Sequence, residues 1–267
     1  MTAPAGSRGH RDAPLTMVGL AREAIVLAGA GAAILLQVAH RPVGAGVARH
    51  SDFARDPLRR LRHTLQYVYA TALPEAAGAR EAVAGWVRSA HRPVAGTDRR
   101  GQAYSAADPQ AQLWVAATLY HAAEEARWRI WGVLDHDRAE EVYRGYAALG
   151  TLLGMPADHW PADRAAFARY WSDAVGTLEV TEEARTISRE LFAAEAGPWW
   201  LRRLMPLARF TAAGMLPHRV RTGLGLDWDG ADSRREDLLW RALRVIYPRL
   251  PRRWRALPSR MVVRTLT

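Results

Sequence analysis

Residues 108–134, DPQAQLWVAATLYHAAEEARWRIWGVL, decide the fold class. Pro109 follows an aspartate at the start of this stretch, and proline is favoured in the first turn of a helix. The apolar residues that follow recur mostly at spacings of three and four, as on one face of a helix. No part of the chain shows a sustained β-type alternation of apolar and polar residues between turn signals. The sequence therefore predicts an all-α protein.

The same spacing predicts helices elsewhere along the chain. They cover residues 17–39, 43–50, 57–72, 75–91, 108–134, 136–153, 161–178, 181–194, 199–215 and 232–247. Asp56-Pro57, Trp160-Pro161 and Thr181 indicate helix starts, and Gly154 indicates an end. The linkers are short and no repeat of solenoid length is present, which predicts one compact domain over residues 16–267. The polar residues 1–15, rich in Gly, Pro and Arg, predict a disordered arm.

Composition excludes several kinds of chemistry. The chain has 267 residues, 49% of them hydrophobic and 24% charged, so it is globular and long enough to enclose a pocket. It has no cysteine, which excludes disulfides, iron–sulfur clusters, thiolate zinc sites and a cysteine nucleophile. All 37 basic residues are arginine, which excludes Schiff-base and P-loop lysines. Any metal must be held by His, Asp, Glu or a prosthetic group.

Charge and hydropathy indicate where the protein acts. The formal net charge is +10, but arginines are scattered among acidic residues, as in Arg138-Ala139-Glu140. We therefore rank a nucleic-acid-binding domain last and expect no nucleic-acid partner.

The longest apolar run, residues 24–36, is shorter than a bilayer-spanning helix and predicts a buried core helix. The polar N-terminus lacks the apolar core of a secretory signal. We therefore expect a cytoplasmic protein, and an extracellular polymer is not the expected substrate.

Tryptophan, arginine and proline become frequent after residue 197, as in PWWLRR (198–203) and PRRW (251–254). We interpret residues 197–267 as a helical cap of the same domain, whose tryptophan rings pack on the core while its arginines reach outward. The alternative is a surface for peripheral membrane contact or for a partner, because such surfaces are rich in both residue types.

The familiar catalytic motifs are absent. Gly29-Ala30-Gly31 lies inside an apolar helix with no preceding strand, so it predicts close helix packing rather than a dinucleotide loop. No G-x-S-x-G elbow, H-E-x-x-H pair or EF-hand loop occurs.

The candidate site residues are instead a set of polar residues on helices. Arg60, His63 and Thr64 share one helix face, and His91 stands at a helix end before a Pro/Gly exit, where it can face a cavity. Neutral imidazole is the usual ligand of haem iron, although a single histidine is more often structural.

Two other histidines allow simpler interpretations. His50 precedes Ser51 and Asp52, either of which can cap the next helix without taking part in catalysis. His121 is expected on an exposed helix face.

In these residues the chain resembles the MpaB-like and rubber oxygenase catalytic domain family, which includes the latex-clearing proteins. The resemblance covers nearly the whole chain after the arm. The stretches that carry it are LLQVAH (35–40), GAGVARHSDF (44–53), DPLRRL (56–61), residues 64–69, YSA (104–106), DP (108–109), WV (114–115), LGTLLG (149–154), GMLP (214–217) and GL (225–226).

The resemblance implies an all-α fold around a buried pocket for haem b, and oxidoreductase chemistry with dioxygen. His91 would be the proximal iron ligand. Arg60 would bind a haem propionate, or would instead form an ion pair with Asp56. Thr64 would place a hydroxyl near the cofactor. The expected function is a haem-dependent oxygenase acting on a hydrophobic small molecule, with an unidentified redox partner.

The chain departs from the family pattern at two positions. Many relatives carry a histidine after Trp-Val, where this chain has Ala116, which puts its activity in doubt. His63 stands where the rubber-cleaving members have a distal lysine, and its imidazole could bind iron or donate a hydrogen bond to bound oxygen. If His63 and His91 both bind iron, the protein would be a haem-binding sensor or a non-catalytic scaffold.

Overall fold

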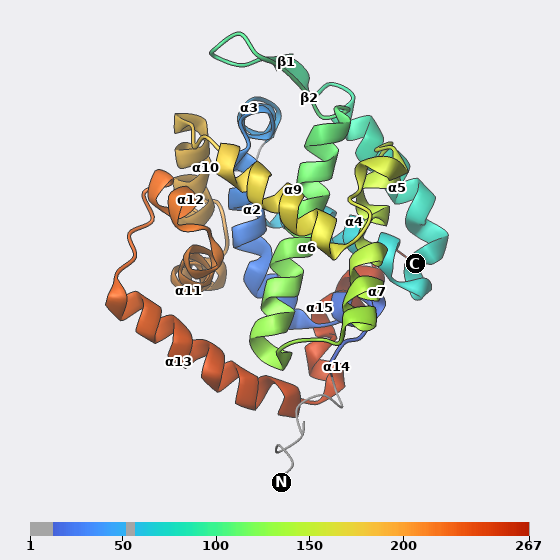
Figure 1. The fold of residues 1–267 in the computed structure, drawn as a ribbon, viewed down its shortest axis with the longest axis vertical. Coiled ribbons are helices and arrows are strands. Elements are labelled where there is room, and N and C mark those ends of the chain that lie inside the picture. Colours follow the sequence, from blue (N-terminus) through green and yellow to red (C-terminus); the bar gives the residue numbers. More distant parts are fainter. Residues whose placement is uncertain (1–12, 52–56, 267) are drawn as a thin grey trace.

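The computed structural model describes residues 13–51 and 57–266. The predictions for the arm before residue 13, for Asp52 and for Asp56 lie outside the described residues. The described chain is mostly helical (Figure 1). The α-helices are α1 (Met17–Ala21), α2 (Ala30–Ala39), α3 (Arg41–His50), α4 (Pro57–Ala72), α5 (Arg80–His91), α6 (Pro109–Trp131), α7 (His136–Tyr146), α8 (Ala148–Thr151), α9 (Arg164–Thr177), α10 (Glu182–Ala193), α11 (Trp199–Met215), α12 (His218–Gly223), α13 (Gly230–Ile246), α14 (Arg252–Arg255) and α15 (Leu257–Val263). Short 3-10 helices η1 (Ala24–Gly29), η2 (Pro74–Ala79), η3 (Ala157–His159) and η4 (Tyr247–Arg249) connect some of them.

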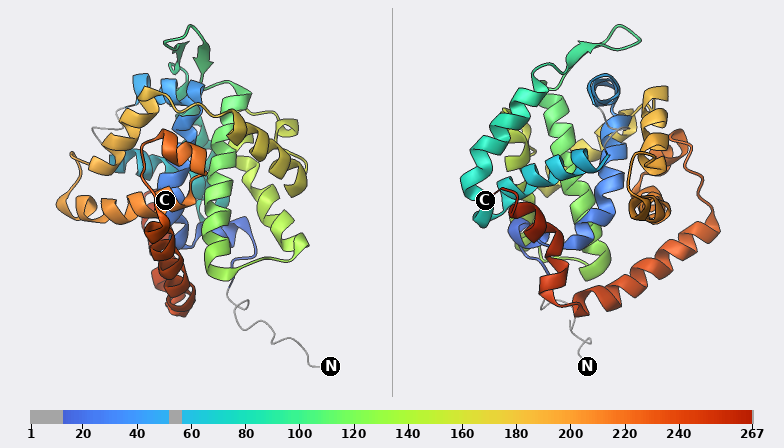
Figure 2. Two further views of the ribbon diagram at one scale, coloured as in Figure 1. Left: turned by 60° about the vertical axis from the view of Figure 1, so that its left-hand side comes forward. Right: turned by 180° about the vertical axis from the view of Figure 1, so that it is seen from behind.

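Helix α6 runs through the middle of the molecule, with α2 beside it (Figures 1 and 2). The preceding turn η1 approaches α6 so closely that a Cβ on Gly29 would lie 2.8 Å from the carbonyl oxygen of Ala122. A larger residue would force the two segments apart. The prediction that these glycines permit close packing is confirmed.

Apolar side chains form two buried clusters, and α6 contributes to both. One cluster joins α2, α10, α11 and the C-terminal helices to residues such as Trp114 and Ile130. The other joins α1, α4, α7 and α9 to residues such as Tyr120. The two clusters therefore pack against different faces of the one long helix α6.

The prediction of an all-α fold is wrong at one place. Residues 95–97 and 103–105 form a two-stranded antiparallel hairpin, β1 (Ala95–Thr97) and β2 (Ala103–Ser105). The Asp98 carboxylate closes its turn by accepting from the backbone N–H groups of Arg100 and Gln102, at 2.8 and 2.9 Å. Strands of three residues are too short to show the alternation that identifies a strand in a sequence.

The predicted helix 17–39 is broken at Glu23, which has extended backbone angles. Its carboxylate accepts from the Tyr247 hydroxyl at 2.8 Å and lies 3.3 Å from the Arg255 guanidinium, while the same hydroxyl accepts from the N–H of Ile25. Two partners from the far end of the chain, Tyr247 and Arg255, thus outweigh local helix propensity, which is a weak preference.

Local capping explains the boundaries that were predicted well. Asp108 accepts from the N–H of Gln110 and Thr181 from that of Ala184, so α6 and α10 begin as expected. Gly154, with φ of +110°, ends the segment after α8 as predicted. The start predicted at Pro161 is wrong, because Asp163 is the residue that caps α9, through the N–H of Ala166.

The helices that the spacing did not predict lie at the C-terminal end. Helices α12, α14 and α15 have four to seven residues each, too few for a recognisable period. In the same region, Trp240 is buried as the cap interpretation expects, but Trp199 and Trp254 are 66% and 61% exposed.

Of the helices in the described ranges, none is by itself long and apolar enough to cross a membrane. Only the segment η1–α2 together with α3 reaches that length and composition, and it is bent by 102° between them.

Candidate functional site

A cavity of about 460 Å³ lies among α3, α4, α5, α6 and the hairpin. Its walls are largely apolar, with Val47, Val87, Val115 and Leu119 among the residues that face it. Its volume is typical of pockets that enclose a small molecule. The polar side chains of its lining come mainly from α4 and from the ends of α3 and α5.

Helix α4 has the range 57–72 that its spacing predicted. Arg60, His63, Thr64 and Tyr67 follow one another at i, i+3, i+4 and i+7, and all four line the cavity. The prediction that Arg60, His63 and Thr64 share a face is therefore confirmed. Their roles toward a cofactor stay predictions.

His91 is the last residue of α5 and faces the same cavity from the opposite helix. Burial lowers the pKa of its imidazole below 6.5, and the positive charge of Arg60 lowers it further. The ring is thus neutral at physiological pH, which is the form that binds a metal.

Arg60 donates from Nη1 to the hydroxyl of Ser51 at 2.9 Å. Burial lowers the pKa of its guanidinium, because the charged group has lost contact with water. The group stays protonated all the same, and it has five N–H donors in a rigid fork. Such a fork can donate two parallel hydrogen bonds to a carboxylate. The alternative partner, Asp56, lies outside the described residues.

His63 packs edge-on against Trp86 of α5, with ring centroids 4.5 Å apart. Trp86 lines the cavity and is 45% exposed. The sequence analysis did not identify Trp86, and no motif marks it. Its position next to His63 depends on how α4 packs against α5.

His50 lines the cavity although it is an exposed residue, so it lies near the opening. Its Nε2 is 3.1 Å from the hydroxyl of Tyr104, which is buried on strand β2. This pair links the end of α3 to the hairpin. Tyr104 belongs to one of the stretches that carry the family resemblance, but the sequence indicated no role for it.

Ala116 also lines the cavity, and it is 2% exposed. The position at which the family resemblance leads us to expect a histidine is thus part of the cavity wall. This chain has a methyl group there, and that wall of α6 is apolar.

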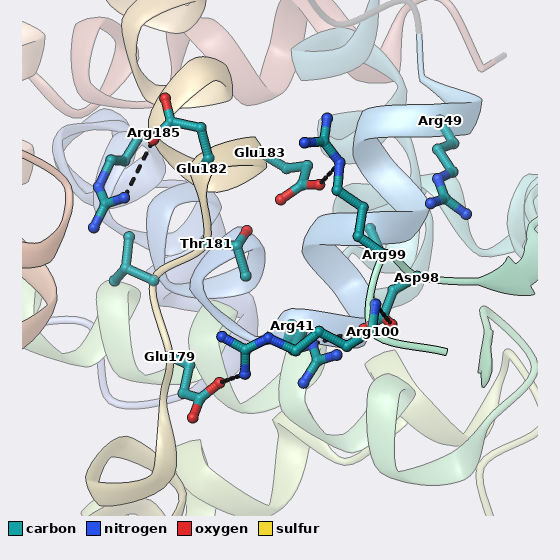
Figure 3. A pocket seen from close by; sticks show the side chains of 12 residues that line it. Arg41, Arg49, Asp98, Arg99, Arg100, Glu179, Thr181, Glu182, Glu183 and Arg185 are labelled. Carbon is teal, nitrogen blue, oxygen red and sulfur yellow. Dashed lines mark hydrogen bonds and ion pairs between the residues drawn. The ribbon is translucent and has the colours of Figure 1, made fainter. Parts of the chain in front are cut away.

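A second cavity of about 280 Å³ lies between α3, the turn of the hairpin and α10, and its polar groups are ion-paired (Figure 3). Arg41 Nε is 2.6 Å from Asp98, Arg99 Nε is 2.7 Å from Glu183, and Arg100 Nη1 is 2.9 Å from Glu179. These pairs tie the hairpin turn to α3, to α10 and to the segment just before α10. The arrangement accounts for the charges without a ligand, so we assign no binding function to this cavity.

His121 lies apart from both cavities, and the prediction that it occupies an exposed helix face is wrong. Its ring stacks on Trp171 of α9 at a centroid distance of 4.0 Å. Burial lowers its pKa to about 4. Trp171 in turn stacks on Trp114, so the imidazole completes an aromatic stack in the core.

Comparison with known proteins identifies the family. Two similar proteins are the uncharacterized protein Mb2261 of Mycobacterium bovis and the uncharacterized protein Rv2237 of Mycobacterium tuberculosis. Each is 33% identical over 225 residues, which cover 82% of this chain and 88% of the relative. No solved structure matches the chain. The family model described as "ER-bound oxygenase mpaB/B'/Rubber oxygenase, catalytic domain" matches residues 19–247. The chain therefore belongs to the family of MpaB and rubber oxygenase catalytic domains.

Proposed function

We propose that the cavity between α4 and α5 binds haem b through His91, and that the protein is an oxygenase acting with dioxygen on a hydrophobic small molecule. The observation that carries this proposal is the meeting of His91, His63, Arg60 and Thr64 around one apolar cavity. These residues come from two helices, and three of them have the spacing of a single helix face.

The residues present fit a haem. An iron ligand must be an unprotonated imidazole, and both burial and the neighbouring Arg60 favour that form of His91. A porphyrin needs apolar walls, which the valines and leucines of α3, α5 and α6 provide. Its propionates need a cationic donor, and the fork of Arg60 suits a carboxylate.

Each residue then has a distinct task. His91 would bind the iron, and Arg60 would hold a propionate and so set the orientation of the ring. The Thr64 hydroxyl would donate a hydrogen bond on the α4 side. His63, held against Trp86, would hold or donate a proton at the cavity wall formed by α4. The apolar wall around Ala116 would exclude water and accept a hydrophobic substrate.

A bound haem supplies the activation of dioxygen, while the protein supplies ligation, orientation and a dry cavity. The valine and leucine side chains of the lining favour a substrate without charge. In keeping with the sequence analysis, we propose a cytoplasmic location for this activity.

Titration of the purified protein with haemin tests the proposal. Wild type is expected to develop a Soret band with saturable uptake, and His91→Ala to lose it. His136→Ala is the matched control, because His136 is an exposed histidine at the start of α7. Full haem uptake and an unchanged spectrum in His91→Ala would refute the ligand assignment.

One observation favours a second candidate function. His63 and His91 line the same cavity, so both could bind the iron and leave no open position, as in a haem sensor. In that case the ferric spectrum is low-spin in wild type and becomes high-spin in His63→Ala.

If the protein is an oxygenase instead, the ferric spectrum of wild type is already that of a high-spin or water-ligated haem. There the loss of a hydrogen bond of about 1 kcal/mol in His63→Ala should speed autoxidation several-fold. No change in spin state or in oxygen kinetics would exclude both roles for His63.

A further inference from the structure

The net charge of the protein is confined to its C-terminal part. Residues 197–267 contain 15 arginines and 5 acidic residues, a difference equal to the whole formal charge of +10. Residues 1–196 contain 22 of each and are neutral. From Leu238 onward there are eight arginines and no Asp or Glu. A charge so localised produces a positive potential on one part of the surface.

The same part of the chain exposes large apolar side chains in two stripes. On α13, Leu238, Val245 and Ile246 are 63%, 54% and 55% exposed and share the outward face with Arg241. On α14 and α15, Trp254, Leu257 and Met261 are 61%, 53% and 60% exposed. Spacings of three, four and seven place each set on one side of its segment.

Exposed arginines flank the second stripe. Arg253, Arg260 and Arg264 follow at intervals of seven and four, and they have no ion-pair partner within residues 13–51 and 57–266. They differ in this from Arg255 of the same segment, which is buried and lies 3.3 Å from Glu23. Within the described residues, these three exposed arginines therefore take no part in a structural ion pair.

The two stripes are joined by a turn that is anchored to the core. Tyr247 in η4 is buried, and its hydroxyl donates to Glu23 and accepts from the N–H of Ile25. Figures 1 and 2 show α13 and α14 at the end of the molecule opposite the hairpin. We call the exposed faces of α13, α14 and α15 the cationic–apolar surface.

We propose that the cationic–apolar surface binds the surface of an anionic phospholipid bilayer. Arginines attract lipid phosphates, and exposed Trp, Leu, Ile and Met side chains enter the boundary between headgroups and acyl chains. A nucleic acid would use the arginines but has no counterpart for aliphatic side chains such as Val245 and Ile246. Lipid is therefore the partner that accounts for both features of the surface, and the inference does not depend on the function proposed for the cavity.

Co-sedimentation of the full chain with vesicles tests this proposal. Binding is expected to vesicles of phosphatidylglycerol mixed with phosphatidylcholine, to be absent with phosphatidylcholine alone, and to weaken as salt is added. The double variant Arg253→Gln/Arg260→Gln removes two charges and is expected to bind about 30-fold more weakly. The control Arg92→Gln/Arg169→Gln removes two exposed arginines outside the cationic–apolar surface and should bind like wild type.

A second pair of variants tests the apolar contribution. Trp254→Ser is expected to weaken vesicle binding about tenfold or more, because a large apolar side chain no longer enters the interface. Met261→Gln is a smaller change, in α15, and should also weaken vesicle binding. It keeps the test valid if Trp254→Ser lowers the stability of the fold. No binding to anionic vesicles, or equal loss in the Arg92→Gln/Arg169→Gln control, overturns the proposal. Tight binding of duplex DNA that Arg253→Gln/Arg260→Gln abolishes and Trp254→Ser leaves unchanged would assign the surface to nucleic acid instead.

Discussion

Two cavities lie against the hairpin, and the helix α3 separates them. Arg41, Ala45 and Arg49, at intervals of four, face the pocket with the ion pairs. Val43, Val47 and His50 face the cavity between α4 and α5. The hairpin is divided in the same way, because its turn closes the first pocket while Tyr104 forms part of the wall of the second.

The two cavities differ in the residues that surround their polar side chains. Beside the hairpin turn, Arg41, Arg99 and Arg100 are each within 3 Å of a carboxylate oxygen. In the other cavity, apolar walls surround histidines and the half-buried Arg60. Beside the hairpin turn, arginine therefore forms ion pairs within the fold, whereas in the other cavity Arg60 is the proposed partner of an anionic group.

The largest expected effect separates these two uses of arginine. Arg60→Ala should weaken haem binding by roughly tenfold to a hundredfold, because a charge-assisted hydrogen bond is worth about 1.5 to 3 kcal/mol. Thr64→Val should cost less, since it removes a neutral hydroxyl. Arg99→Ala, in the ion-paired pocket, is the control and should leave haem affinity unchanged. Equal haem retention in wild type and Arg60→Ala on dilution would show that Arg60 is only structural.

The next effect concerns stability and affects the ion-paired pocket instead. Arg41 and Asp98 retain only 19% and 7% side-chain exposure, so Arg41→Ala should lower the free energy of unfolding by about 1 to 3 kcal/mol. The pair between Arg100 and Glu179 is mostly exposed, and Arg100→Ala should cost no more than about 1 kcal/mol. Urea denaturation of both variants measures the difference. If both variants lose the same free energy, burial of the Arg41 pair is not what stabilises the hairpin.

The smallest effect is a difference in pH dependence between the two cavities. Because burial and Arg60 keep the pKa of His91 below 6.5, haem binding should persist at pH 6.5 and fall only as the pH drops through that lowered pKa. In Arg60→Gln the pKa of His91 moves back toward 6.5, so haem loss should begin at a higher pH. Soret absorbance followed against pH measures both, and identical acid limbs in the two proteins would contradict the coupling.

The ion-paired pocket should withstand the same acidification. Burial by itself raises the pKa of Asp98, but hydrogen bonds from the Gln102 N–H and the Arg41 guanidinium outweigh it and hold the pKa below 3.8. The stability that this carboxylate contributes is present above 3.8 and is lost only as the pH falls through the lower folded-state value. The difference in thermal unfolding temperature between wild type and Arg41→Ala measures this contribution. It should therefore stay constant over the pH range in which haem dissociates.

The sequence by itself determined the features that depend on near neighbours. The spacing of α4 placed Arg60, His63 and Thr64 on one face, and the caps at Asp108 and Thr181 located the starts of α6 and α10. These follow from helix geometry and from hydrogen bonds that span at most four residues. The order of short motifs along the chain was also enough to indicate the family.

Only the tertiary structure decided which distant residues meet. The break at Glu23 depends on Tyr247 and Arg255, more than two hundred residues away, and the contact of His63 with Trp86 depends on how two helices pack. The burial of His121 and the exposure of Trp254 reverse what their residue types alone predict, because burial is a property of the packed molecule. Contacts between distant residues carry no local period, so no spacing in the sequence can indicate them.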